Sequence, residues 1–269
     1  MSLPSRVSAD ALLDMHTGTV GNTLTAAALG NGTRGNANLD GWGVAPDPPT
    51  GFTIGAHADN RALGGVVVVD AVEYGPSNAS QSLAFDHTQN FTVVLTSLTA
   101  GKRRVTMAGW ITFGPPQVAP GSAVLFDYLI VHGAATGQYV CLQLLNGAAP
   151  GNTYGLNLET NPGGVTTHSA YITLVPGDTY WVTFQADFTG GTARLEVYST
   201  AFVQVGATAS VAQTTGEDIQ IIRIGNNEAG TAAATSYFEN WLVDYTNAVF
   251  PLGPGRPSLR QQRLLLGVG

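Results

Sequence analysis

One hairpin-like stretch, DTYWVTFQADFTGGTARLEVY (178–198), carries the residue types that bind carbohydrate. Strand alternation places Tyr180, Val182 and Phe184 on one face, which is the more apolar and should face a core. The opposite face combines a ring with polar groups, and saccharides stack their C–H faces on rings while their hydroxyls need polar partners. Across this stretch and two earlier strands, the residues that we predict to bind glycan are Trp110, Asp127, Trp181, Gln185, Asp187, Arg194, Glu196 and Tyr198.

Two other interpretations of these residues stay open at this stage. They are ordinary outer-face residues, since protein interfaces use the same residue types, or Trp181 is covered by a loop. Trp110 lies in RVTMAGWITF (104–113), and Asp127 interrupts the apolar run AVLFDYLIV.

A second candidate site is a calcium loop in the Gly- and Asn-rich N-terminal part. The residues Asn36, Asn38, Asp40 and Asp47 repeat the oxygen-ligand spacing of an EF-hand loop, with Gly41 at its sixth position. Only two of these ligands are carboxylates, and no helical pattern flanks them. A Gly/Asn-rich turn explains the segment equally well, so we predict no cofactor, with calcium as the alternative.

The composition excludes several classes of protein. Charged residues make up 11% of the 269 residues and the net charge is −7, which argues against nucleic-acid binding because phosphate affinity needs clustered Lys and Arg. Cys141 is the single cysteine and lies in an apolar run, so we predict a buried thiol and no intrachain disulfide. No apolar run reaches membrane-spanning length, and we expect no membrane partner.

Strand patterns dominate the chain, with Gly, Pro, Asn and Thr between them. Such a series of short strands predicts an all-β, two-sheet antiparallel sandwich or jelly roll, here as one domain over 1–252. Residues 18–65 have little strand signal and are predicted to form long loops. The predicted strands are 82–87, 91–98, 104–113, 123–132, 138–145, 153–159, 170–174, 179–188, 193–199, 218–225 and 237–245.

Four stretches within residues 80–250 resemble, in order, motifs of the concanavalin-A-like (laminin-G-like) jelly-roll superfamily. RVTMAGWITF resembles an early strand, the hairpin 178–198 the central hairpin, IRIGNN (222–227) an inner strand, and YFENWLVDY (237–245) the closing strand. Glu239 stands where the superfamily often has Asp. The resemblance implies a concanavalin-A-like jelly roll.

The known enzymes of this superfamily have motifs that the chain lacks. Its glucanases carry E-x-D-x-x-E, which sets two carboxylates on one sheet face, and its alginate lyases carry Q-x-H, and neither pattern occurs. A polysaccharide hydrolase or lyase with a non-standard active site is therefore the third-ranked function, and the sequence favours a non-catalytic protein.

The segment 253–269 breaks the strand pattern and is predicted to be an arm that binds a partner. Its arginines could pair with acidic groups and its leucines could bury apolar surface; the residues concerned are Arg256, Arg260, Arg263, Leu264, Leu265 and Leu266. The N-terminus, MSLPSRVSADALLDMHTG, has no apolar run of signal-peptide type. We therefore expect a phage virion subunit, for capsid decoration or tail association, that is oligomeric and possesses glycan binding as a second role. A secreted carbohydrate-binding module is the alternative.

Overall fold

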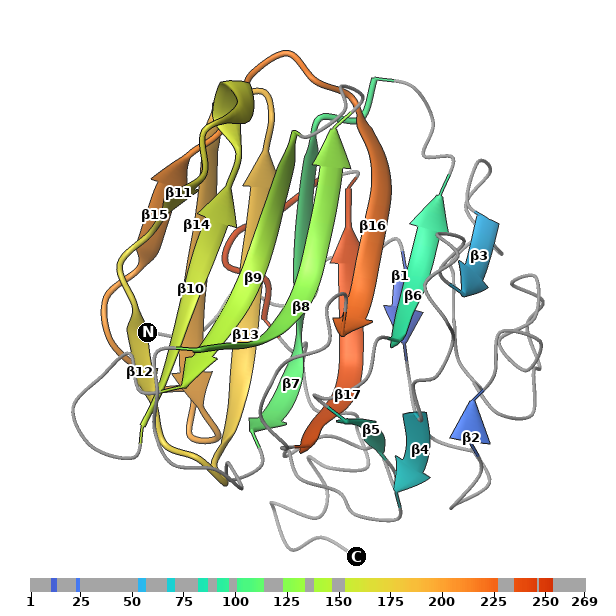
Figure 1. Ribbon diagram of the computed structural model, residues 1–269, viewed down its shortest axis with the longest axis vertical. Coiled ribbons are helices and arrows are strands. Elements are labelled where there is room, and N and C mark those ends of the chain that lie inside the picture. Colours follow the sequence, from blue (N-terminus) through green and yellow to red (C-terminus); the bar gives the residue numbers. More distant parts are fainter. Residues whose placement is uncertain are drawn as a thin grey trace, which may run out of the picture.

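The computed structural model describes residues 11–13, 23–24, 53–56, 67–70, 82–86, 91–96, 101–113, 123–133, 138–146, 153–226, 235–245 and 247–253. These residues form two antiparallel β-sheets stacked as a sandwich, which confirms the all-β, two-sheet jelly-roll prediction (Figure 1). The one helical element described is a single 3-10 turn, Pro162–Gly164.

One sheet has nine strands. Their order is β15 (Ala209–Ala212), β14 (Thr192–Ser199), β13 (Thr179–Asp187), β7 (Arg104–Phe113), β17 (Thr235–Asp244), β5 (Ser82–Asp86), β4 (Val67–Asp70) and β2 (Thr23–Leu24), with β1 (Ala11–Leu13) also paired to β17.

The other sheet has eight strands. Their order is β11 (Thr167–His168), β10 (Tyr154–Thr160), β9 (Tyr139–Asn146), β8 (Ala123–Gly133), β16 (Ile219–Asn226), β6 (Phe91–Thr96) and β3 (Thr53–Ala56), with β12 (Ile172–Leu174) also paired to β10.

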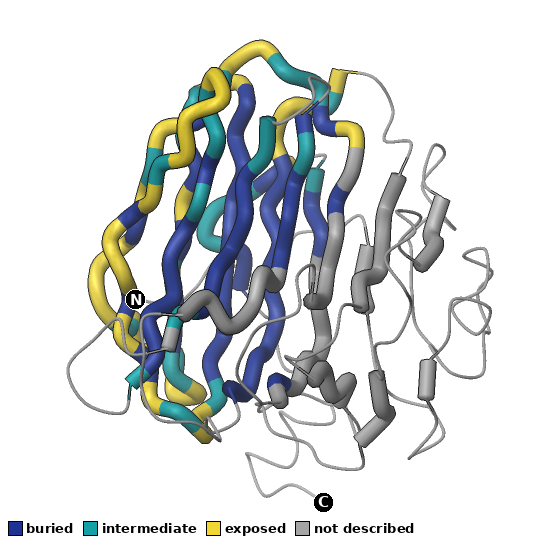
Figure 2. The backbone as a smooth tube through the Cα atoms, viewed as in Figure 1, coloured by how far each residue is buried: buried dark blue, intermediate teal, exposed yellow. Residues whose placement is uncertain are grey.

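Alternation along each strand builds the core between the sheets. On β13, Tyr180, Val182 and Phe184 belong to the main buried cluster, as predicted, and the same cluster includes Leu156 and Leu158 of β10 in the other sheet. Figure 2 shows the central strands of the described part as buried and their connecting turns as exposed. Each sheet therefore has an inner face in this core and an outer face turned away from it.

The hairpin of β13 and β14 is closed by Asp187. Its Oδ1 accepts hydrogen bonds from the backbone N–H of Thr189 (2.9 Å) and Gly190 (2.7 Å), and its Oδ2 lies 2.8 Å from Nη2 of Arg104. Gly191 has φ +66°, in the left-handed region that favours glycine. The carboxylate thus joins the turn to the neighbouring strand β7.

Residues 247–253, which we name the strap, cross the outer face of the nine-stranded sheet. Asp244, at the end of β17, starts the strap by accepting hydrogen bonds from the N–H of Asn247 (3.0 Å) and Val249 (3.3 Å). The Leu252 N–H then donates to Thr183 Oγ1 on β13 (3.0 Å).

Two sequence predictions need correction. The segment 18–65 was predicted as loops, yet it contributes strands Thr23–Leu24 and Thr53–Ala56 to the sheet edges. Strands β1, β4, β11 and β15 were not predicted either, because two to four residues give too short a pattern. Among the described residues, no helix has the length and apolarity to cross a membrane.

Candidate functional site

Trp110 and Trp181 do not form the open sugar platform predicted from sequence. They are 1% exposed, lie edge to face with their ring centroids 5.2 Å apart, and pack with Leu252 of the strap. Trp181 Nε1 donates to the Leu252 carbonyl at 2.8 Å. The strap covers both rings, so the alternative in which a loop covers Trp181 describes the structure.

Gln185 and Asp187 also have structural partners. Gln185 Nε2 donates to Thr106 Oγ1 (3.0 Å) and to the Ala248 carbonyl of the strap (2.8 Å). Burial raises the pKa of Asp187. The N–H groups of Gly190 and Thr189 and the Arg104 guanidinium lower it by more, so the pKa lies below its usual value. The two side chains therefore stabilise the strap and the β13–β14 turn.

The remaining predicted residues of the hairpin lie on β14. Arg194 is exposed, Tyr198 is buried and Glu196 is intermediate. Glu196 accepts hydrogen bonds from the Tyr198 hydroxyl and from Thr208 Oγ1, the latter at 2.7 Å. Glu196 and Tyr198 are therefore already hydrogen-bonded within the protein.

Other predicted site residues lie outside what is described. For Asp127 only the strand backbone is described, and it pairs with Gln143 in the register of β8 with β9. The calcium candidates Asn36, Asn38, Asp40 and Asp47 and the arm residues of 254–269 fall outside the described ranges. Within those ranges, no three His, Cys, Asp or Glu side chains gather as metal ligands. Cys141 is a buried free thiol, as predicted.

A second cluster of polar side chains lies on the outer face of the eight-stranded sheet. Tyr139 and Gln143 come from β9, Asn157 and Glu159 from β10, and His168 from β11. These positions alternate with Val140, Leu142 and Leu144 on β9 and with Leu156 and Leu158 on β10, all in the core. Register pairs Asn157 with Gln143 and Glu159 with His168, so alternation brings the polar side chains together.

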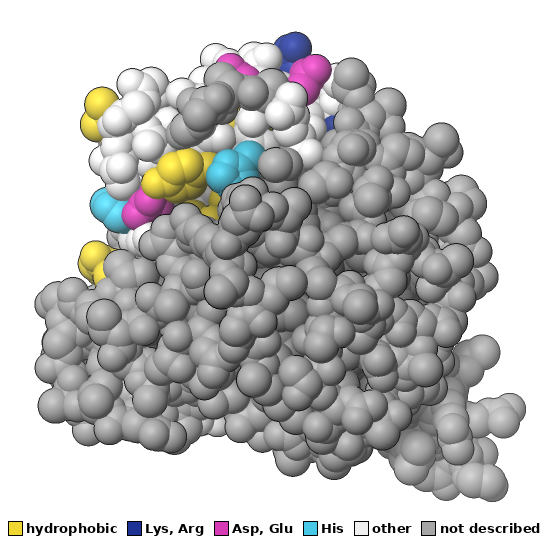
Figure 3. Space-filling model, turned by 45° about the vertical axis from the view of Figure 1, so that its right-hand side comes forward, with side chains coloured by type: hydrophobic (Ala, Val, Ile, Leu, Met, Phe, Trp, Pro, Cys, Tyr) yellow, Lys and Arg dark blue, Asp and Glu magenta, His cyan; other side chains and the backbone are white. Residues whose placement is uncertain are grey.

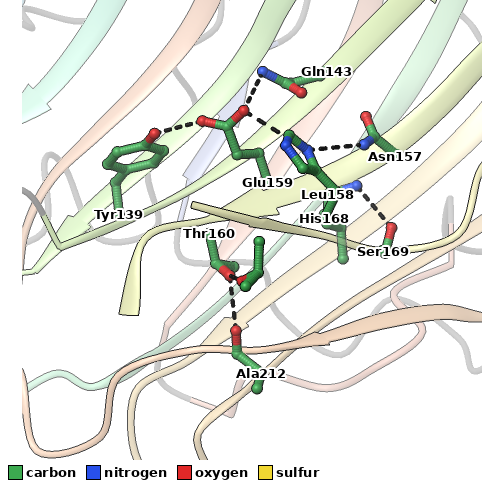
Figure 4. A network of polar contacts seen from close by, with 10 residues as sticks. Tyr139, Gln143, Asn157, Leu158, Glu159, Thr160, His168, Ser169 and Ala212 are labelled. Atoms are coloured by element: carbon green, nitrogen blue, oxygen red, sulfur yellow. Dashed lines mark hydrogen bonds and ion pairs between the residues drawn. The ribbon is translucent and has the colours of Figure 1, made fainter. Parts of the chain in front are cut away.

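Glu159 is the centre of this cluster (Figure 4). The Tyr139 hydroxyl donates to its Oε1, Gln143 Nε2 donates to its Oε2 at 2.8 Å, and His168 Nδ1 lies 3.8 Å from the same Oε2. Asn157 Nδ2 lies 3.4 Å from His168 Nδ1. Burial, the hydrogen bond to Glu159 and its negative charge all raise the pKa of Tyr139, so the phenol stays protonated at neutral pH.

Two acceptors in this cluster have no partner. Gln143 Oε1 and Asn157 Oδ1 are buried and accept no hydrogen bond, although the residues are only 5% and 0% exposed. A buried polar atom without a partner costs about 1–3 kcal/mol. Buried amide atoms of Asn161 and Gln213 also lack a partner, but Gln143 and Asn157 are paired residues within this polar cluster, which marks it as a candidate ligand site.

Aromatic rings border the polar cluster. The His132 and Tyr139 rings have centroids 6.1 Å apart at one end. At the other end, Tyr171 is 48% exposed and directly precedes Ile172, whose register partner Leu156 adjoins Asn157. Figure 3 shows the histidine, hydrophobic and acidic side chains gathered on this side of the molecule.

Our sequence analysis did not single out these residues. Their signal is the outward alternation of polar side chains in two adjoining apolar strands, YVCLQLLN and YGLNLET. His168 joins the cluster only through the pairing of β10 with β11, which local pattern does not reveal.

Comparison with protein-family models finds no match, and comparison with curated protein sequences finds none. Solved structures give similarities of fold. The alginate lyase from Klebsiella pneumoniae aligns over 66% of this chain and 84% of its own, with 7% identity and a TM-score of 0.47. The cellulose-induced protein Cip1 aligns over 73% and 92%, with 14% identity and a TM-score of 0.48.

A phage protein is also similar in fold. The enzymatically active domain of tailspike protein 2 from bacteriophage CBA120 aligns over 63% of this chain and 27% of its own, with 14% identity and a TM-score of 0.42. TM-scores below 0.5 at such identities carry no inference about what this chain binds.

Proposed function

We propose that this protein binds carbohydrate, without cleaving it, on the outer face of the eight-stranded sheet. The observation that carries the proposal is the pair of buried, unpartnered acceptors, Gln143 Oε1 and Asn157 Oδ1. A sugar hydroxyl donates the hydrogen bond that each lacks, and Tyr171 offers an exposed ring for stacking.

The same geometry favours binding over hydrolysis. Glycosidases use two carboxyl groups about 5–5.5 Å or 6.5–9.5 Å apart. Among the side chains described in the polar cluster, Glu159 is the single carboxylate, and both of its oxygens already accept hydrogen bonds, from Tyr139 and Gln143. Asp127 pairs with Gln143 in the strand register, but only its backbone is described. We therefore expect binding without the release of product.

Titration calorimetry against a panel of soluble oligosaccharides tests the proposal. The variant Gln143→Leu removes one unpartnered acceptor, and Gln185→Leu is the matched control, because it makes the same change under the strap. We expect a ligand with a Kd below 1 mM, which corresponds to about −4 kcal/mol, at least fivefold weaker binding by Gln143→Leu, and unchanged binding by folded Gln185→Leu.

Three results would contradict the proposal. They are no binding at millimolar concentration, equal binding by wild type and Gln143→Leu, and new reducing ends or unsaturated products in the same samples. The last result would replace binding by catalysis at this face.

We also propose, from the resemblance and composition given above, a concanavalin-A-like phage virion subunit that presents this face to host-surface glycan. Light scattering of the full chain and of a version that ends at Gly253 tests the subunit role. We expect an oligomer that the truncation disrupts, and monomers in both samples would overturn it.

A further inference from the structure

We infer that the ligand is an uncharged, hydroxyl-rich glycan and that this face discriminates against polyuronates. The inference rests on the proposed function and deepens it by naming the ligand class. The evidence is the identity of the unpartnered atoms, which are both acceptors, and the negative charge of Glu159 beside them.

The orientation of Gln143 is fixed by its neighbour. Its amide lies 2.8 Å from Glu159 Oε2, and a carboxylate oxygen accepts only from an N–H. A reversed amide would set two acceptors against each other. The free atom of Gln143 is therefore the oxygen Oε1, which requires a donor from the ligand.

The Tyr139 hydroxyl and the Asn157 amide donate to other members of the cluster. The Tyr139 hydroxyl donates to Glu159 Oε1, and Asn157 Nδ2 faces His168 Nδ1, which leaves Asn157 Oδ1 as the free atom. Because His168 Nδ1 accepts from Asn157, the imidazole carries its hydrogen on Nε2. A ligand thus meets two amide oxygens and a carboxylate, all of them acceptors, beside this one ring N–H. Hydroxyl groups satisfy such a surface, whereas a ligand carboxylate adds further acceptors and a like charge.

None of the Lys and Arg side chains that the structure describes belongs to the polar cluster, and the exposed Arg194 lies on β14 of the nine-stranded sheet. Arg103 pairs with Asp218 and Arg104 with Asp187, and Lys102 lies 5.2 Å from the centroid of the Tyr245 ring. Only the backbone of Arg223 is described, and it pairs with Ile130. Its strand, β16, is three strands from β10, which carries Glu159, so the two backbones are roughly 14 Å apart at the usual spacing of neighbouring strands. The net charge of −7 acts in the same direction.

The test compares sugars that share a backbone and differ in charge. The pairs are mannohexaose with the mannuronate hexamer and cellohexaose with its glucuronate counterpart, titrated at low and high salt. We expect a neutral hexaose to bind at least tenfold more tightly than its uronate, and its own Kd to be insensitive to salt. The variant Glu159→Gln removes the negative charge and should narrow the ratio severalfold.

Equal or tighter binding of the uronate by wild type overturns this inference and leaves the proposed glycan binding intact. An unchanged ratio in folded Glu159→Gln also overturns it. If no member of either pair and no sugar of the wider panel binds, the proposed function fails and this inference falls with it. The wild-type comparison alone decides the question if the variant does not fold.

Discussion

Gln185 and Gln143 are almost equally buried, at 4% and 5% exposure, and both stand on the outer face of a sheet. Under the strap, Gln185 donates to Thr106 and to the Ala248 carbonyl. On the opposite sheet, Gln143 donates to Glu159 but leaves its oxygen without a partner. The strap covers the outer face of the nine-stranded sheet at Gln185, whereas the outer face of the eight-stranded sheet retains acceptors without a hydrogen-bond partner.

This difference shows that residue type and burial do not identify a binding face. The nine-stranded sheet carries Trp110 and Trp181, yet the strap already hydrogen-bonds to the polar groups beside them. The eight-stranded sheet carries the amides of Gln143 and Asn157, whose unpartnered oxygens require a hydrogen-bond donor from a ligand. The following experiments should separate stability on the first face from binding on the second.

The largest effect is expected from Trp181→Ala. The change opens a cavity between Trp110 and Leu252 and removes the donor to the Leu252 carbonyl, so it should lower the free energy of unfolding by about 3–5 kcal/mol. Urea denaturation measures the loss. Trp181→Phe, which keeps a ring, should lose less, and a sizeable fall in glycan affinity of either folded variant would contradict the division between the faces.

A second comparison uses buried amides on the two faces. Gln185→Leu removes two hydrogen bonds and leaves the Thr106 hydroxyl and the Ala248 carbonyl short of a donor, which should cost about 1–3 kcal/mol. Asn157→Leu removes an unpartnered oxygen together with one long, 3.4 Å contact to His168, and should change stability by less than about 1 kcal/mol, in either direction. Equal losses in denaturation experiments would show that the faces do not differ.

A smaller effect, dependent on pH, is expected from Asp187→Asn. The amide keeps an acceptor for Thr189 and Gly190 but loses the charge beside Arg104. Because the folded pKa of Asp187 lies below its unfolded value of about 3.9, the stabilisation is complete above that pH and disappears as pH falls through the folded pKa.

Urea denaturation between pH 7 and pH 3 measures the gap between wild type and Asp187→Asn. The gap should be under about 1 kcal/mol at pH 7 and shrink below pH 4. A gap that stays constant over this range would show that the ion pair contributes nothing.

The smallest effect on stability is expected from Tyr171→Ala. The ring is 48% exposed, so the free energy of unfolding should change by no more than about 0.5 kcal/mol. Binding of the neutral hexaose should nevertheless weaken severalfold through lost stacking. Unchanged binding in calorimetry would remove Tyr171 from the site while leaving Gln143 and Asn157 in it.

Sequence patterns predicted the strands well because alternation is a local signal. The strand 104–113 was predicted with the bounds that the structure has, and the inward and outward sets of β13 were assigned correctly. The two-sheet architecture followed from the number and spacing of such runs.

The position of the site could not be predicted in the same way. Alternation shows that Trp181 points outward, but the strap that covers it comes from residues about 70 positions later. Likewise, Glu159 meets Gln143 and His168 through pairing between strands. Whether a buried polar side chain has a hydrogen-bond partner depends on these long-range contacts, and local sequence patterns do not reveal them.

The strap has a consequence for the order in which the chain is made. Trp181 is synthesised 71 residues before Leu252, a delay of about 4–14 s at usual translation rates. During that interval the aromatic face of β7 and β13 lacks its cover, and it offers a hydrophobic surface to chaperones or to other nascent chains. A chain cut before residue 247 would keep that surface for its whole lifetime, and its defect would appear as insoluble protein.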